Sequence, residues 1–215
     1  MGGAVIVDTT AFGQLLIAQP VIACALLGWL TGDVSAGLTI GMAHQLVWLR
    51  LVPLGGSIHL QGNFAAISGT GTAVLLLHHG AAGWYGPVLI GLLYGIFCGH
   101  LAGYLVPIHR NWNGWLVSLG GTNPSPAGIT VRQAGGALVT AAGGGLLTLA
   151  AVIPAYQLFH AWSGLNSPRM ESAGALAVAA FLGVGIITVT QMFWQRKQWY
   201  MIAVGAFCAA LWWWI

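Results

Sequence analysis

The side chains best suited to binding chemistry are five polar residues in an otherwise apolar, glycine-rich stretch, residues 19–63. They comprise four amides and one carboxylate: Gln19, Asp33, Gln45, Gln61 and Asn63. A neutral polyhydroxylated ligand needs paired hydrogen-bond donors and acceptors rather than net charge, and amides supply both. Trp29 and Trp48 lie in the same stretch and offer rings that can stack on a sugar face. The pattern favours recognition of a sugar or another small polyol.

Asp33 and Gln45 are the leading candidates among these five residues, with Gln61, Asn63 and Gln19 behind them. The chain has only three acidic residues, and an ionisable side chain at the centre of a bilayer costs roughly 2.5–3.5 kcal/mol on insertion scales. Such a residue is therefore a functional candidate. The alternative interpretation is that the amides only tie neighbouring helices together, as polar side chains often do in membranes.

Other kinds of chemistry have weaker support. Ser68 follows Ala66 rather than the glycine expected two residues before an intramembrane serine nucleophile, and no histidine can be paired with it. His78 and His79 are adjacent and lack the spacing of metal ligands. The three cysteines are far apart in apolar runs, which is typical of buried packing. We expect no metal and no cofactor.

Composition indicates an integral membrane protein. Hydrophobic residues make up 58% and charged residues 4% of the 215 residues, against roughly 25% charged residues in soluble domains. A net charge of +3 is too small and too scattered to indicate nucleic-acid binding. Since a span needs about 20 apolar residues, we expect an all-α, polytopic fold with about six to seven transmembrane or re-entrant helices in one membrane domain, residues 1–215.

Apolar runs broken by glycine, proline, asparagine and charge place these helices along the chain. The segments 34–52 and 64–79 are short and glycine-rich, so either can be a re-entrant or broken helix of the kind that lines a transport site. The polar stretch 111–128 is expected to be the longest loop. The predicted helices cover roughly residues 11–30, 34–52, 64–79, 84–108, 132–155, 172–194 and 198–215.

Basic residues predict the orientation of the chain in the membrane. Alternating crossings place Arg50, Arg110, Arg132 and the Arg196–Lys197 pair on one side and leave only Arg169 on the other. The first side is therefore expected to be cytoplasmic. Asp8 interrupts the N-terminal apolar run, so no cleaved secretory signal is expected.

Residues 19–56 carry a spaced signature, QPVIACALLGWLTGDVSAGLTIGMAHQLVWLRLVPLGG. It resembles the N-terminal signature of the enzyme II C component of the mannose, fructose and sorbose branch of the phosphotransferase system (PTS). The matching positions are Pro20, Gly32, Asp33, Gly37, Gly41, Leu46, Val47, Trp48, Val52, Pro53 and Gly55. Order and spacing agree without a gap, whereas the rest of the chain agrees in hydropathy.

The resemblance implies a multi-pass inner-membrane permease that binds a hexose-type sugar and moves it inward while partner subunits phosphorylate it. Such C components (IIC) work in a complex with a membrane-embedded D component (IID) and with soluble A and B components (IIA and IIB). The phosphoryl group passes along histidines of IIA and IIB, so no catalytic residue is expected in this chain. Phosphorylation, rather than an ion gradient, would then drive transport.

The sequence departs from the family at three usually charged positions. Gln19 stands where the family usually has arginine, Gln45 where it has glutamate, and Gln61 where it often has aspartate. The chain also begins late relative to the family, so the usual first helix is expected to be shortened or absent. These departures leave open a non-transporting scaffold or sensor that recruits phosphotransferase components. A small-solute channel or a vitamin-binding membrane subunit is a third possibility.

Overall fold

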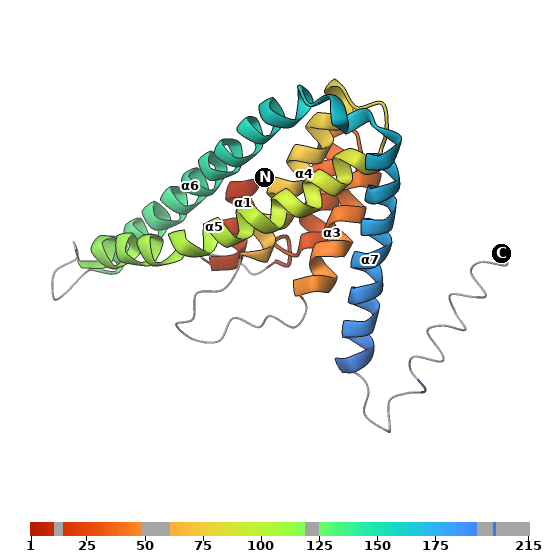
Figure 1. Cartoon of the computed structure of the whole chain (residues 1–215). Coiled ribbons are helices and arrows are strands. Elements are labelled where there is room, and N and C mark those ends of the chain that lie inside the picture. Colours follow the sequence, from red (N-terminus) through yellow and green to blue (C-terminus); the bar gives the residue numbers. More distant parts are fainter. Residues whose placement is uncertain (11–14, 49–60, 119–124, 193–199, 201–215) are drawn as a thin grey trace.

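The computed structural model describes residues 1–10, 15–48, 61–118, 125–192 and 200, and the regular secondary structure of this part of the chain is entirely helical. The all-α fold expected from the sequence is therefore confirmed (Figure 1). The elements are α1 (Gly2–Thr10), α2 (Pro20–Thr31), α3 (Val34–Trp48), α4 (Gly62–His79), α5 (Tyr85–Ser118), α6 (Pro126–His160), the 3-10 helix η1 (Ser163–Asn166) and α7 (Pro168–Met192). The predicted span 198–215 lies almost wholly outside the described residues.

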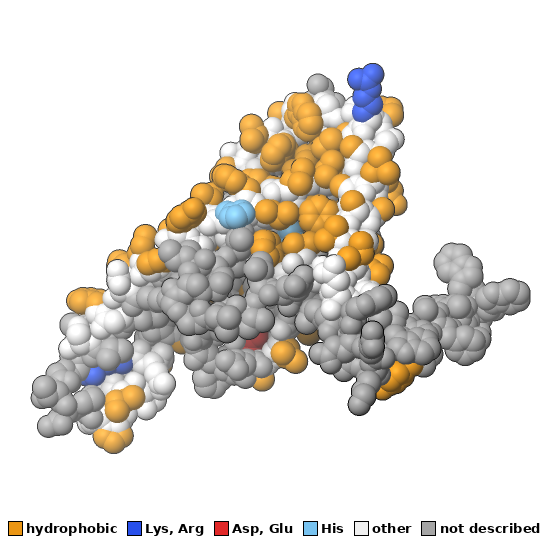
Figure 2. Space-filling view, turned by 60° about the horizontal axis from the view of Figure 1, so that its bottom comes forward, with side chains coloured by type: hydrophobic (Ala, Val, Ile, Leu, Met, Phe, Trp, Pro, Cys, Tyr) orange, Lys and Arg blue, Asp and Glu red, His pale blue; other side chains and the backbone are white. Residues whose placement is uncertain are grey.

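Three of the described helices are long and apolar enough to cross a membrane. These spans lie in α5, α6 and α7, over Tyr85–Leu105, Pro126–His160 and Pro168–Gln191. Hydrophobic side chains cover much of the face shown in Figure 2, and charged side chains are sparse there. An apolar outer surface of this kind is suited to contact with lipid rather than water, which agrees with the multi-pass membrane location expected from the sequence.

Helices α5 and α6 are longer than the sequence indicated. Their 34 and 35 residues correspond to about 50 Å at 1.5 Å per residue, well beyond a hydrocarbon core of about 30 Å. The two helices converge at the lower left of Figure 1. The prediction of a loop over residues 111–128 is therefore wrong for 111–118 and 126–128, which are helical.

Helices α2 and α3 form a tight antiparallel hairpin. Pro20 opens α2 at a position where its missing N–H is no loss, and Gly32 ends the helix with φ of 87°, in the left-handed region. Gly28, Gly37 and Gly41 lie where any Cβ atom would meet the backbone of the facing helix. With 12 and 15 described residues, each helix is shorter than the ~20 residues of a full span.

Helix α4 is the central element of the fold. It contacts α2, α3, α5 and α6, and almost every residue from Phe64 to Leu76 is buried. Small residues make this possible, because Gly69 of α4 and Gly91 of α5 approach each other backbone to backbone. The polar side chains on α3 and at the start of α4 are thus held against the best-packed part of the molecule.

Two carboxylates tie helix ends together. Asp8, at the end of α1, accepts hydrogen bonds from the backbone N–H groups of Leu15 (2.6 Å) and Ala18 (2.8 Å), ahead of α2. Glu171, on α7, accepts from the backbone N–H groups of Tyr85 (3.0 Å) and Gly86 (3.1 Å) at the start of α5. Both groups satisfy donors that a helix end or a turn leaves without an intrahelical partner.

Candidate functional site

The last turn of α3 carries a group of buried polar atoms that make no hydrogen bond. They are both ring nitrogens of His44, Oε1 of Gln45 and Nε1 of Trp48, and each lacks a partner within the described part of the chain. His44 is the most enclosed of the three residues, with 1% of its surface exposed. A buried polar group without a partner costs about 1–3 kcal/mol. Several of them on one turn indicate a place where another molecule supplies the missing partners.

The neighbours of His44 on two other helices define the position of this turn. A Cβ atom on Gly95 of α5 would lie 2.8 Å from His44 Nε2, so the imidazole occupies the space that this glycine leaves open. The same position faces the backbone of Ala65 on α4. His44 therefore lies where α3, α4 and α5 meet.

The start of α4 brings two predicted residues to the same place. The backbone N–H of Gln61 donates a hydrogen bond of 3.1 Å to the carbonyl of Gly99, one turn along α5 from Gly95. Gly62 faces the Trp48 ring, and a Cβ atom there would lie 2.8 Å from Trp48 Cγ. Gln61 and Asn63, which flank Gly62, are both half-buried. The structure thus places Gln61 and Asn63 beside the last turn of α3, the turn that also carries Gln45.

Gln19 lies at the same end of the α2–α3 hairpin, on its outer side. It is the residue before Pro20, and Pro20 faces Gly41 across the hairpin, one turn before Gln45. The Gln19 side chain is exposed and makes no capping hydrogen bond to α2. Gln19 is therefore level with the amide region without being enclosed by it.

Asp33 lies at the opposite end of α3 from this region. Gln45 follows it by three helical turns, a rise of about 18 Å at 1.5 Å per residue. One carboxylate oxygen of Asp33 accepts hydrogen bonds from the Ser35 hydroxyl (2.7 Å) and the Ala36 backbone N–H (2.9 Å). This is the arrangement of a helix N-cap. Of the five predicted residues, four lie at one end of the hairpin and Asp33 lies at the other.

The two tryptophans do not flank one site. Trp48 packs against Gly62 beside Gln45, whereas Trp29 is on the last turn of α2, near Asp33, with 69% of its surface exposed. Only Trp48 is positioned to present a ring to a ligand at the amide region.

Sequence reasoning overlooked His44. The residue is flanked by apolar and small side chains in GMAHQLVW, and nothing in its spacing marks it. The available signal was a titratable residue in an apolar run directly before a leading candidate, Gln45, since ionisable groups inside a membrane are costly and tend to be functional.

The structure gives no support to nucleophilic or metal chemistry among the described residues. The Ser68 hydroxyl, the candidate nucleophile, donates to the carbonyl of Phe64 at 2.7 Å within its own helix. No group of three or more metal-ligating side chains is found in the described segments.

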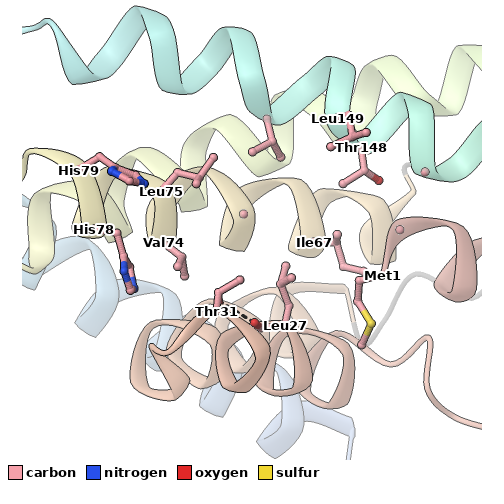
Figure 3. A pocket seen from close by; sticks show the side chains of 14 residues that line it. Met1, Leu27, Thr31, Ile67, Val74, Leu75, His78, His79, Thr148 and Leu149 are labelled. Carbon is pink, nitrogen blue, oxygen red and sulfur yellow. Dashed lines mark hydrogen bonds between the residues drawn. The ribbon is translucent and has the colours of Figure 1, made fainter.

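A separate cavity of about 540 Å³ lies between α1, α2, α4 and α6. Figure 3 shows His78 and His79 at one end of its lining residues and Met1 at the other. None of the five predicted residues lines it. Its walls are mainly aliphatic, so it differs in character from the amide region.

Comparisons with known proteins identify the family and the fold. The family model described as "PTS system sorbose-specific iic component" matches residues 3–213. No curated protein matches the chain. A solved structure titled "Structure of membrane protein" is similar in fold, with a TM-score of 0.67 and 17% sequence identity over 97% of this chain and 81% of that chain. Since the family model spans nearly the whole sequence, this chain belongs to the family of sorbose-specific IIC components of the phosphotransferase system.

Proposed function

We propose that this chain is the subunit that binds a hexose-type sugar and carries it across the membrane while partner subunits phosphorylate it. Membership of the IIC family makes it a sugar permease subunit that works with other phosphotransferase components. The finer proposal is that these partners are a IID membrane subunit and soluble IIA and IIB phosphocarriers.

The observation that carries the proposal is the set of unpartnered polar atoms on the last turn of α3. Gln45 Oε1 is an acceptor, Trp48 Nε1 is a donor, and the His44 imidazole can do both. Sugar hydroxyls donate and accept hydrogen bonds, so one ligand can complete all of these groups. The half-buried Gln61 and Asn63 on α4 stand beside this turn and enlarge the polar surface. Gln19 forms the outer edge of the proposed site.

The hydrogen bonds of the three acidic side chains support transport that is driven by phosphorylation rather than by an ion gradient. Proton-driven transporters commonly carry the proton on an ionisable side chain inside the membrane. Asp8, Asp33 and Glu171, the three acidic residues of the chain, each accept backbone N–H hydrogen bonds at a helix end or in the segment leading to a helix. All three carboxylates are thus engaged in structural hydrogen bonds, which supports a driving force supplied by partner subunits.

The position of Asp33 favours a role in shaping the hairpin. Its carboxylate holds the first turn of α3, three turns from the amide region. We therefore assign sugar contact to Gln45, Gln61, Asn63 and Gln19, with His44 and Trp48 added. Asp33 then fixes the α2–α3 turn from which α3 extends to that site.

Uptake of labelled hexoses, including sorbose, tests the proposal. The chain is expressed with its IIA, IIB and IID partners in a host that lacks its own hexose permeases. Phosphorylation-dependent accumulation is expected, with a several-fold loss in Gln45→Ala at low sugar concentration. Gln157→Ala, which removes an exposed amide on α6, serves as the control and should transport normally. Recruitment of IIA and IIB without uptake would contradict the permease and favour the scaffold or sensor. Failure of any IID subunit to co-purify would favour a small-solute channel that acts without phosphotransferase partners.

A further inference from the structure

The cavity between α1, α2, α4 and α6 has walls suited to a hydrocarbon chain. It is lined by aliphatic side chains from three of these helices: Leu27 on α2, Ile67, Val74 and Leu75 on α4, and Leu149 and Val152 on α6. Its volume of about 540 Å³ lies within the range of ligand-binding pockets, roughly 300–1,000 Å³. Figure 3 shows these walls along one side of α4.

The two hydroxyl groups in the lining already donate to the backbone. Thr31 Oγ1 donates to the carbonyl of Leu27 at 2.7 Å, and Thr148 Oγ1 donates to the carbonyl of Gly144 at 2.8 Å. A sugar enclosed here would leave most of its hydroxyls unpaired, at a cost of about 1–3 kcal/mol each. The interior of the cavity therefore disfavours a sugar and favours an apolar ligand.

The polar part of the lining is concentrated at one end of α4. His78 and His79 are the last two residues of this helix, and both side chains are exposed. The His79 ring meets Tyr156 edge to face, with ring centroids 5.7 Å apart. The His78 ring lies beside the α2–α3 turn, where a Cβ atom on Gly32 would be 3.5 Å from Cε1. Both imidazoles are thus placed at the mouth of the cavity.

This end of the bundle is a membrane–water boundary. The connection from α4 to α5 begins there, and Asn166 of η1 binds it through the backbone of Gly80 and Ala82. The exposed Arg169 and the Glu171 carboxylate stand on the first turn of α7 at the same end. Polar and charged groups gather at this level because the hydrocarbon core excludes them.

The length of the cavity matches one leaflet of a bilayer. From His78 to Ile67, the lining follows three turns of α4, about 16 Å at 1.5 Å per residue. Half of a hydrocarbon core of about 30 Å is nearly the same distance. The cavity therefore has a polar mouth at headgroup level and an apolar interior that reaches toward the bilayer midplane.

We propose that this cavity binds a phospholipid, with one acyl chain along α4 and the phosphate at His78 and His79. Imidazole N–H groups hydrogen-bond phosphate oxygens, and the aliphatic walls replace neighbouring lipid chains. The bound lipid fills the space that α1, α2, α4 and α6 enclose. This site is separate from the amide region, so the proposal does not depend on sugar transport.

Photo-crosslinking of the complete chain in lipid nanodiscs tests the proposal. The probe is a phosphatidylglycerol with a diazirine at the end of one acyl chain, and the labelled residues are identified by mass spectrometry. Adducts are expected on Leu27 and Thr148, half-buried lining residues toward the inner part of the cavity. Adducts confined to outward-facing residues such as Leu146 and Leu176 would overturn the proposal.

A matched pair of glycines on α6 provides the variants. Gly145 lines the cavity and Gly143 does not, and a Cβ atom at either position would meet nothing within 4 Å. Gly145→Phe should fill the cavity and lower the inner adducts by about tenfold, equivalent to about 1.4 kcal/mol. Gly143→Phe makes the same change two residues away and should label like the wild type. Equal labelling in both variants would contradict the proposed occupant.

A second lipid probe tests whether His78 and His79 bind the phosphate. A diacylglycerol probe with the same chains lacks the phosphate, and the wild type should label with it about tenfold less than with the phospholipid. The variant His78→Ala/His79→Ala should label equally with both probes. Equal labelling by both probes in the wild type would refute the phosphate contact.

Discussion

Asp33 holds the first turn of α3 through a hydrogen bond of 2.9 Å from the backbone N–H of Ala36 to its carboxylate. The same oxygen accepts a hydrogen bond from the Ser35 hydroxyl at 2.7 Å. Gly32, directly before Asp33, ends α2 in the left-handed conformation. Two adjacent residues therefore end one helix and begin the next, which gives the signature element Gly32–Asp33 a structural role.

Replacing Asp33 separates capping from ligand binding. Asp33→Ala should lower stability by about 0.5–2 kcal/mol through loss of the cap, whereas Asp33→Asn keeps a side-chain oxygen at the N-cap and should stay close to the wild type. Thermal unfolding of the purified protein measures the stability lost with the cap. Calorimetric titration with sugar measures whether the variants still bind the ligand. A stable Asp33→Asn variant that no longer binds sugar would place Asp33 in the site.

Sugar affinity should respond differently to removal of the Gln45 amide and to its replacement by a carboxylate. Gln45→Ala removes a neutral hydrogen bond to the sugar, worth about 0.5–1.5 kcal/mol, and should weaken binding several-fold. Gln45→Glu restores the family's usual carboxylate, and a charge-assisted bond is worth about 1.5–3 kcal/mol. Its sugar affinity should therefore equal or exceed that of the wild type. Calorimetry on the complex checks both variants, and unchanged affinity in both would remove Gln45 from the site.

The contact between α7 and α3 depends on the absence of a side chain at Gly185. A Cβ atom there would lie 2.6 Å from Leu46 Cδ1 and 2.8 Å from Leu46 Cγ. Gly185→Ala should therefore lower stability by about 1–3 kcal/mol through overpacking. Gly183→Ala is the control on the same helix, because a Cβ atom at Gly183 meets nothing within 4 Å.

The double variant Gly185→Ala/Leu46→Gly distinguishes overpacking from a general loss of glycine, because it also removes the Leu46 Cβ atom that a Cβ at Gly185 would meet first. If Leu46 is the obstacle, the double variant should lose less stability than the two single changes added together. Thermal unfolding in one detergent measures all four proteins. Strict additivity would show that the Leu46 side chain is not what Gly185 accommodates.

Glu171 should stabilise the start of α5. Glu171→Ala removes the acceptor of the Tyr85 and Gly86 backbone N–H groups and should cost about 1–3 kcal/mol. Glu171→Gln retains one oxygen acceptor and should recover part of the loss. Hydrogen exchange at the first turn of α5 reports the effect locally, and unchanged exchange in Glu171→Ala would contradict the cap.

The fold class could be read from composition and hydropathy, but helix lengths could not. The runs at 84–108, 132–155 and 172–194 predicted the three long helices α5, α6 and α7. Their ends were misplaced because α5 continues through Pro107 and α6 through Pro154. Proline breaks a soluble helix more reliably than a membrane helix, where neighbouring groups can satisfy the freed backbone.

The candidate site was predictable in part. Sequence predicted Gln45, Gln61 and Asn63 as site residues, and the approach of Gly62 to Trp48 places Gln61 and Asn63 beside the turn of α3 that carries Gln45. Sequence also grouped Asp33 with them, because nearness along the chain does not show that a straight helix separates two residues. A glycine followed by an aspartate before an apolar run is a known signal for the end of one helix and the cap of the next. That signal predicts the role that Asp33 has in the structure.

The glycine contacts between α2 and α3 have a mechanical consequence. At Gly28, Gly37 and Gly41 the two helices touch backbone to backbone, so no flexible side chain lies between them to absorb sliding. We therefore expect α2 and α3 to move together as one body. If that body tilts about its middle, Asp33 at one tip and Gln45 near the other move in opposite directions. The hairpin can thus act as a lever that converts a shift at one membrane surface into an opposite shift at the amide region.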